Sequence, residues 1–195
     1  MLVLDRQLIL IGVIKISKKI YVIRHCEAMG QSPNVHLTDK GCKQALDLSR
    51  FFTLIKIDRI IASPYTRAID SIQPLSKKLG LHVESDKRLT ERVLSTKNLS
   101  DWLEKLKSTF EDPELKFEGG ESSTEATKRI VEVIEEVFAG NDEHTIVVTH
   151  GNLMSLLFNY YDKNFGFNNW KSLSNPDVFL LSNDDSNVTL KRVWK

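Results

Sequence analysis

Short apolar runs recur along this chain, and several are followed by segments in which apolar residues return every three or four positions. The first run, 20–23, reads Ile-Tyr-Val-Ile and stops abruptly at the polar pair Arg24-His25. Runs of this length that are rich in β-branched and aromatic residues favour buried strands. The chain contains five such runs, at 20–23, 59–62, 144–149, 178–181 and 188–193.

Helical periodicity begins after the first strand and again after the second. Thr38 can cap the first of these helices through its hydroxyl group. Ser63 and Pro64 have the residue types of an N-cap and of the first helical position, and this second helix should close near Gly80. Pro74 lies within its pattern and is expected to kink or break it.

A third helix is predicted over 121–138, with acidic residues at its start and Gly140 at its end. The polar stretch 183–187 separates the last two strands, which suggests a hairpin at the edge of a sheet. Repeated alternation of strands and helices predicts an α/β fold, a three-layer α/β/α sandwich around a mainly parallel sheet.

The stretch 93–120 interrupts this alternation. It is rich in Lys, Glu and Asp and contains Trp102 among its few aromatic residues. We interpret it as a small cap insertion over one end of the sheet, within a single domain at 18–195. Residues 1–17 are predicted to be an N-terminal extension, to which the sequence assigns no function.

Composition and charge narrow the choice of partners. The chain of 195 residues is 41% hydrophobic and 27% charged, which is typical of a soluble globular protein, and its net charge is +1. This balance gives no indication of nucleic acid or an acidic membrane as a partner, and no apolar run of 18 residues predicts a membrane span. Cys26 and Cys42 lack metal-site spacing, so we expect a cytoplasmic location, with Cys42 in the core.

Three predicted strands end in side chains that suit phosphoryl chemistry. Arg24 and His25 follow the first strand, Arg67 lies in the first turn after the second, and His150 follows the third with Gly151 permitting a sharp turn into a helix. The carboxyl ends of parallel strands meet at one edge of a sheet, so these groups should converge. Guanidinium groups match phosphoryl oxygens, and a neutral imidazole can attack phosphorus.

With these residues in view, the sequence resembles the histidine phosphatase superfamily, and within it the phosphoglycerate-mutase-like branch. Any one of the matching pieces is a weak signal, but together they occur in the family's order and in the expected context of strands and helices. The pieces are "RHCEA" (24–28), "LTDKGCKQA" (37–45), "SPYTRA" (63–68), "LTER" (89–92), "GGES" (119–122) and "VVTHG" (147–151).

The resemblance implies a role for each matching residue. His25 would be the nucleophile that becomes phosphohistidine. Arg24 and Arg67 would bind the phosphoryl group, and His150 would donate a hydrogen bond to it. Glu91 would protonate the leaving oxygen and then activate water.

The resemblance also implies that Gln31 contacts the phosphate, at a position where the family often has Asn. It implies neither a metal nor a cofactor, because arginine and imidazole groups supply the positive field. Cys26 stands where the family usually has Gly, and a thiol beside the nucleophile suggests sensitivity to oxidation.

The implied activity is a phosphatase that hydrolyses small phosphomonoesters, with a small phosphorylated metabolite as its partner. A phosphoglycerate mutase is the first alternative, but 93–120 lacks the adjacent arginine pair with which mutases bind a second acid group, and "VLSTK" (93–97) replaces their aromatic stretch. The second alternative is a non-catalytic module that binds phosphorylated ligands. The oligomeric state is left open.

Several residues also have plainer interpretations. His25 taken alone would be a structural histidine, Glu91 a solvated loop carboxylate, and Ser63 as readily a helix cap as a ligand. Glu121 is expected to cap or orient the helix that follows it. The lysines of 93–120 either favour anionic substrates or form a solvated face.

Overall fold

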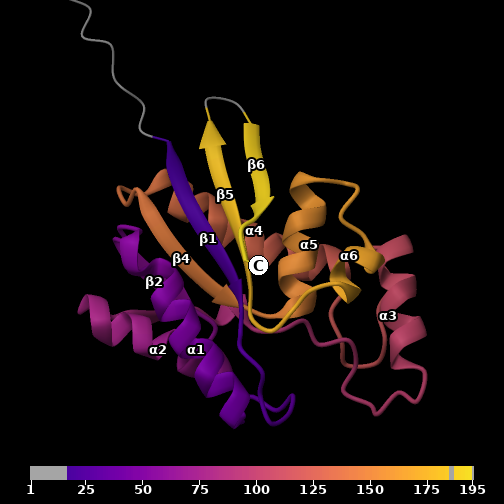
Figure 1. Cartoon of the computed structure of the whole chain (residues 1–195). Helices are drawn as coiled ribbons and strands as arrows, with labels where there is room; N and C mark the ends of the chain where they lie inside the picture. Colours follow the sequence, from indigo (N-terminus) through magenta and orange to yellow (C-terminus); the bar gives the residue numbers. More distant parts are fainter. Residues whose placement is uncertain (1–16, 185–186, 195) are drawn as a thin grey trace, which may run out of the picture.

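The computed structural model describes residues 17–184 and 187–194, so the predicted extension at 1–17 lies outside the described residues except for its last position. Within the described residues six strands form one sheet, in the order β3-β2-β4-β1-β5-β6 (Figure 1). The strands are β1 (Lys18–Arg24), β2 (Arg59–Ala62), β3 (Val83–Ser85), β4 (His144–Thr149), β5 (Asp177–Asp184) and β6 (Asn187–Arg192).

Pairing within the sheet is parallel for β1 with β4, β4 with β2, and β2 with β3, whereas β5 pairs antiparallel with both β1 and β6. The register places Arg24 opposite Thr149 and Ala62 opposite Val148. The carboxyl ends of β1, β2 and β4 therefore lie at the same edge of the sheet, as the sequence predicts.

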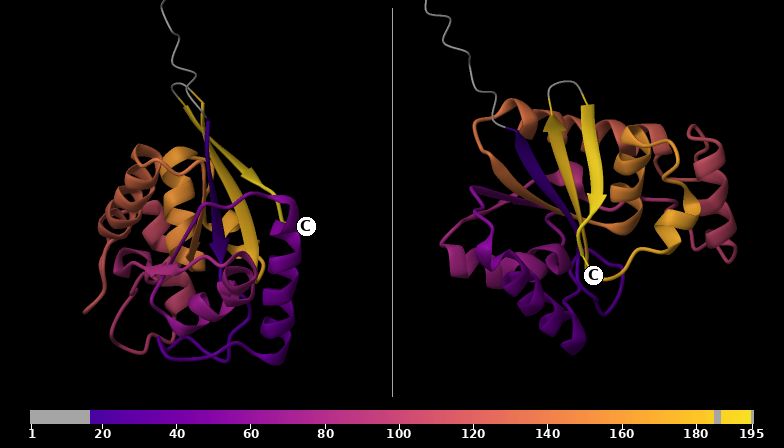
Figure 2. Two further views of the ribbon diagram at one scale, coloured as in Figure 1. Left: turned by 90° about the vertical axis from the view of Figure 1, so that its left-hand side faces the viewer. Right: turned by 45° about the horizontal axis from the view of Figure 1, so that its top comes forward.

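Helices cover both faces of the sheet, which makes the three layers visible in Figure 2. The helices are α1 (Asp39–Phe51), α2 (Thr66–Leu79), α3 (Trp102–Glu111), α4 (Ser123–Ala139), α5 (Gly151–Tyr161) and α6 (Phe167–Lys171). Alternate residues of β1 divide between the two layers: Ile20 and Val22 pack with α4 and α5, while Tyr21 and Ile23 pack with α1 and α2. This alternation is why a continuous apolar run forms the centre of the sheet.

The predicted α/β/α fold and the hairpin of β5 and β6 at the sheet edge are confirmed. The short strand β3 was not predicted, because Val83–Ser85 has one apolar residue in three and a half-exposed edge position. The predicted start of α4, residue 121, lies two residues before the observed start at Ser123, because Ser122 caps this helix by a reciprocal pair of hydrogen bonds with Glu125.

The start of α2 differs from the prediction. Its N-cap is Tyr65, without a side-chain cap, and Ser63 precedes the helix. Pro74 lies inside α2 without ending it, because its neighbours Ile72 and Leu75 are fully buried and their packing holds the helix on both sides of the proline. Gly80 ends the helix in the left-handed conformation, with φ at 67°.

Residues 93–120 contain α3, which lies beside α6 at one side of the molecule (Figure 1). Within the described residues, the helices are all too short or too polar to span a membrane.

Candidate active site

The strand ends bring two histidines together. The backbone N–H of His25 donates to the carbonyl of Thr149 at 3.1 Å, which continues the pairing of β1 and β4 beyond the strands. The imidazole rings of His25 and His150 then lie with centroids 5.1 Å apart, edge to face. Two residues 125 positions apart in sequence, each following a buried strand, thus form one site.

His25 is held in a defined tautomer. Its Nδ1 lies 2.6 Å from the carbonyl oxygen of Cys26, which can only accept, so Nδ1 carries the hydrogen. Its Nε2 accepts a hydrogen bond from Nε of Arg67 at 3.2 Å. Burial, together with the charges of Arg67 and Arg24, lowers the pKa of His25 to about 4. The imidazole is therefore neutral at physiological pH, with its lone pair at Nε2.

Arg67 connects this imidazole to the loop after β1. The side chain is 1% exposed, and its Nη1 donates to the carbonyls of Gln31 and Ser32, both at 2.9 Å. Its guanidinium carbon also lies 4.9 Å from the centroid of the Tyr65 ring. Among the described residues no carboxylate forms an ion pair with this buried guanidinium, and this suits it to an anionic ligand.

Arg24 approaches from the other side of the site. Its Nη1 donates to the carbonyl of Leu173 at 3.0 Å, while its buried Nε has no hydrogen-bond partner among the described residues. A Cβ at Gly151 would lie 3.0 Å from that Nε. Glycine lets the guanidinium lie against the backbone here, because a Cβ would press on it, whereas the sequence suggested that glycine permits a sharp turn.

His150 is positioned by Ser63. Its Nε2 lies 2.8 Å from Oγ of Ser63, and the same hydroxyl oxygen accepts the backbone N–H of Tyr65 at 3.3 Å. We assign the one hydroxyl hydrogen of Ser63 to His150 Nε2, an arrangement in which the imidazole hydrogen lies on Nδ1. That Nδ1 is buried without a partner among the residues described, and burial lowers the pKa of His150 well below its usual value.

Glu91 lies at the start of α5. Its carboxylate accepts three backbone hydrogen bonds, from Asn152 at 3.1 Å, Leu153 at 3.0 Å and Arg92 at 2.9 Å. The positive end of the helix dipole favours a carboxylate at this position. Glu91 is therefore fixed beside the two histidines rather than free in a solvated loop.

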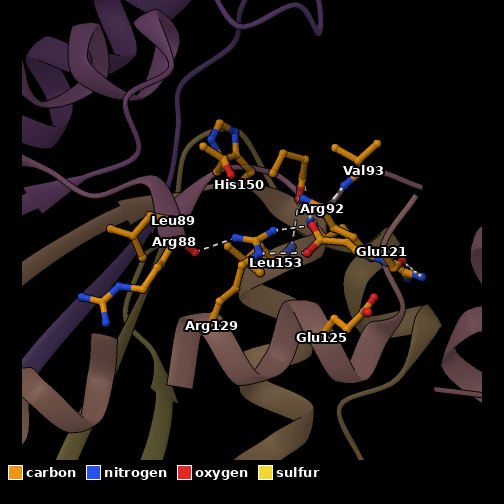
Figure 3. Close-up of polar contacts among 12 residues, drawn as sticks. Arg88, Leu89, Arg92, Val93, Glu121, Glu125, Arg129, His150 and Leu153 are labelled. Carbon is orange, nitrogen blue, oxygen red and sulfur yellow. Dashed lines mark hydrogen bonds and ion pairs between the residues drawn. The ribbon is translucent and has the colours of Figure 1, made fainter. Parts of the chain in front are cut away.

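The segment that carries Glu91 is itself held by a partly buried ion pair. Arg129 of α4 donates to both carboxylate oxygens of Glu121 and, through Nη1, to the carbonyl of Arg88 (Figure 3). Glu121 in turn accepts the backbone N–H of Val93 at 3.3 Å, and its carbonyl accepts from Arg92. Glu121 thus orients the chain around Glu91 and does not cap α4.

A pocket of about 500 Å³ adjoins this site. Its lining includes Arg24, Glu91, Gly151 and the exposed Gln31, whereas His25, Arg67 and His150 are not part of it. Both polar atoms of the Asn152 carboxamide are buried in its lining without a hydrogen-bond partner in the described part of the chain. Sequence reasoning missed Asn152, although it directly follows the "THG" motif.

Sequence reasoning also missed the loop before β5. The side-chain amide of Asn175 donates to the backbone carbonyl of His25 at 2.7 Å, and the backbone carbonyl of Leu173 binds Arg24. No local pattern marks these residues, because they act through backbone atoms that only the fold brings near.

The cysteine expectations change with the structure. Cys26 is fully buried, and burial raises the pKa of its thiol to about 12. A thiol is oxidised through its thiolate, so the predicted sensitivity to oxidation is not supported. Cys42 was expected in the core but is exposed.

A mainly parallel sheet whose strand ends gather two imidazoles, two guanidinium groups and a carboxylate defines a class of α/β proteins suited to phosphoryl groups. Comparison with known protein families matches residues 20–194 to the histidine phosphatase superfamily (branch 1). The chain belongs to this family, and the predicted family is confirmed.

Individual relatives agree with this assignment. A protein of Hydrogenobacter thermophilus, named as a candidate phosphoserine phosphatase, is 28% identical over 149 residues, which cover 69% of this chain and 73% of the relative. A mycobacterial glucosyl-3-phosphoglycerate phosphatase has a similar structure, with a TM-score of 0.71, 23% identity and coverage of 90% of this chain and 97% of its own.

A phosphoglycerate mutase from Bacillus anthracis is also similar, with a TM-score of 0.71, 18% identity and coverage of 91% of this chain and 92% of its own. At these identities the two solved structures show a shared fold, which confirms the predicted phosphoglycerate-mutase-like architecture.

Proposed function

We propose that the protein is a phosphatase that hydrolyses small phosphomonoesters through a phosphohistidine formed on His25. The observation that supports this most directly is the state of His25, a buried neutral imidazole whose Nε2 lone pair lies 3.2 Å from a guanidinium nitrogen. An imidazole with this pKa keeps its lone pair at physiological pH, as a nucleophile requires.

The phosphoryl group would bind between the guanidinium groups of Arg24 and Arg67. The unpartnered Nε of Arg24 and Nδ1 of His150 are donors that a phosphoryl oxygen would satisfy. These donors are fixed before the ligand arrives, so they can stabilise the charge that develops on the oxygens during transfer.

In the first step, Nε2 of His25 forms a bond to phosphorus as the bond from phosphorus to the ester oxygen breaks. For this step Glu91 carries a proton when the ester binds, and it gives that proton to the leaving oxygen. In the second step water attacks phosphorus, Glu91 takes the proton of that water, and the bond from phosphorus to His25 breaks. Inorganic phosphate leaves, and both side chains return to their starting states.

Family membership and the names of the relatives support a phosphatase over the two alternatives. A mutase needs cations for a second acid group, and a silent binding module has no need of a nucleophile and an acid held in these orientations. A small phosphorylated metabolite remains the predicted partner. Cys26 and Cys42 are free thiols, and the cytoplasm remains the predicted location.

The test is release of phosphate from p-nitrophenyl phosphate, measured in EDTA, with His25→Ala as the variant and the exposed His36→Ala as the matched control. We expect turnover by the wild type and by His36→Ala, and a loss of at least about 10³-fold in His25→Ala. Acid-labile phosphate on the wild-type protein, absent from His25→Ala, would identify the intermediate. Turnover that survives in His25→Ala contradicts the proposal.

A further inference from the structure

The outer wall of the pocket is aromatic and apolar. Trp102, the first residue of α3, lines the pocket and is 50% exposed. The Trp170 ring, also in the lining, meets it edge to face with centroids 6.5 Å apart. Trp170 is fixed in turn by stacking on Phe167 at 5.3 Å. A large aromatic side chain held in place yet left half exposed in a pocket is typical of a ligand contact.

Positive charge near this wall is already engaged by protein groups. Arg92 lines the pocket but is 5% exposed, and its nitrogens donate to Thr109 and to the carbonyl of Glu121. Lys97, at the outer end beside Trp102, forms an ion pair with Glu118 at 3.2 Å. A second acid group on the substrate would therefore meet no free cation in the described part of this wall.

The lining also offers an amide that protein groups leave unused. Asn152 presents both a donor and an acceptor that have no partner among the described residues, which suits a neutral hydroxyl or a ring nitrogen. A pocket of about 500 Å³ is also larger than a phosphorylated three-carbon acid needs.

We propose that this pocket selects phosphomonoesters of uncharged, ring-bearing alcohols, with the ring against Trp102 and Trp170 and a polar atom on Asn152. This inference rests on the proposed function and specifies its substrate class. Sugars and nucleosides both supply such rings, through a sugar face or a heteroaromatic base. Their shared chemistry is a flat or weakly polar face with the phosphate as the sole charged group.

The first test compares kcat/KM for two ring-bearing esters, adenosine 5′-monophosphate and glucose 6-phosphate, with that for two small acids, 3-phosphoglycerate and O-phosphoserine. The variants are Trp102→Ala and, as a matched control, Leu103→Ala, the neighbouring exposed residue of α3 outside the pocket. We expect Trp102→Ala to lower kcat/KM about tenfold for at least one ring-bearing ester and not for the acids. Leu103→Ala should change neither.

Comparing the two ring-bearing esters shows whether a nucleoside base or a sugar contacts Trp102. A loss confined to the nucleotide indicates a base against Trp102, and a loss confined to the sugar phosphate indicates a sugar face. Equal losses for all four esters, or a wild type that prefers the acids, would overturn the proposal while leaving the phosphatase activity itself established.

Binding gives a readout that does not depend on turnover. Dissociation constants of the same four esters are measured by calorimetry on His25→Ala and on His25→Ala/Trp102→Ala. Ring-bearing esters should bind the single variant more tightly than the acids, and the second substitution should remove this preference. If the wild type shows no turnover but this preference exists, the proposed function fails and the selectivity stands. Acids that bind as tightly, or no binding of any ester, overturn the selectivity.

Discussion

Two regions meet at the pocket and are built differently. The proposed catalytic floor is made of Arg24, His25, Arg67 and His150. All four but the half-buried Arg24 are buried, and the group is tied to backbone atoms of β4, the loop after β1 and the loop before β5. The cap, residues 93–120, presents Trp102 half exposed and holds Lys97 and Lys116 in exposed ion pairs.

On the proposals above, the floor carries out the reaction and the cap selects the substrate. A buried group with several fixed contacts cannot adapt to one substrate without losing its function for all. An exposed side chain on a short helix can change at little cost to the fold. Changes in the floor should therefore affect all esters alike, whereas changes in the cap should affect some esters and spare others.

The largest expected effect comes from Arg67→Ala. Removing a guanidinium that faces the transferred phosphoryl group should lower kcat/KM about 10³-fold, equally for ring-bearing and acidic esters. Arg59→Ala is the matched control, because Arg59 lies on β2 with its exposed partner Glu84 and should retain activity. A loss confined to one class of ester would show that Arg67 selects substrates, which contradicts its assignment to the floor.

Some of that loss could come from unfolding, since Arg67 is fully buried. Arg67→Met keeps the aliphatic stem, and its thermal unfolding midpoint should be measured beside its activity. A folded Arg67→Met protein with wild-type kcat/KM would show that the reaction does not need the Arg67 guanidinium.

Lowering the pH should destabilise the protein through the histidines of the floor and not through residues of the cap. The folded-state pKa of His25 is about 4, below its unfolded value near 6.5, so the unfolded chain binds a proton that the folded chain does not. The free energy of unfolding should fall as the pH drops below 6.5, by about 2 kcal/mol from His25 at pH 5. His150 should act in the same direction.

Urea unfolding between pH 7.5 and 5 measures this effect. His25→Gln should have a shallower pH dependence than the wild type. Identical slopes in the two proteins would show that His25 binds protons equally in the folded and unfolded states, which contradicts the lowered pKa.

A smaller effect is expected for Ser63→Ala. Without the Ser63 hydroxyl, His150 loses the contact that places its hydrogen on Nδ1, and we expect kcat to fall about tenfold for every ester. Imidazole ¹⁵N chemical shifts should show the Nδ1–H tautomer of His150 in the wild type and a mixture in the variant. Ser63→Thr, which keeps a hydroxyl, should restore both. An unchanged tautomer in Ser63→Ala would leave Ser63 a purely structural residue.

The sequence predicts the fold and the convergence of strand-end residues well, because both depend on local patterns. Apolar runs mark β1, β2 and β4, and parallel pairing brings the residues at their carboxyl ends, including His25 and His150, to one edge. The small strand β3 and the unbroken α2 escape the same reasoning. Their formation depends on neighbours in the fold and not on their own residues.

The residues of the candidate site also divide into those that local patterns predict and those that depend on the fold. Arg24, His25, Arg67, Glu91 and His150 lie in motifs with recognisable order, and the structure places them together. Ser63 and Asn175 make contacts with partners that are far away in sequence, and only the fold brings the Asn152 carboxamide to the pocket, so spacing alone does not predict their contributions. Their catalytic roles, and those of the predicted residues, remain predictions until the variants are measured.

The contacts of the floor with the loop before β5 have a consequence for synthesis on the ribosome. Arg24 and His25 emerge early, but the carbonyl of Leu173 and the amide of Asn175 follow 149 and 150 positions later than the residues they bind. A nascent chain therefore carries His25, the proposed nucleophile, for most of translation without these contacts. Catalytic competence arrives only with the last part of the polypeptide, so truncated translation products lack a finished site.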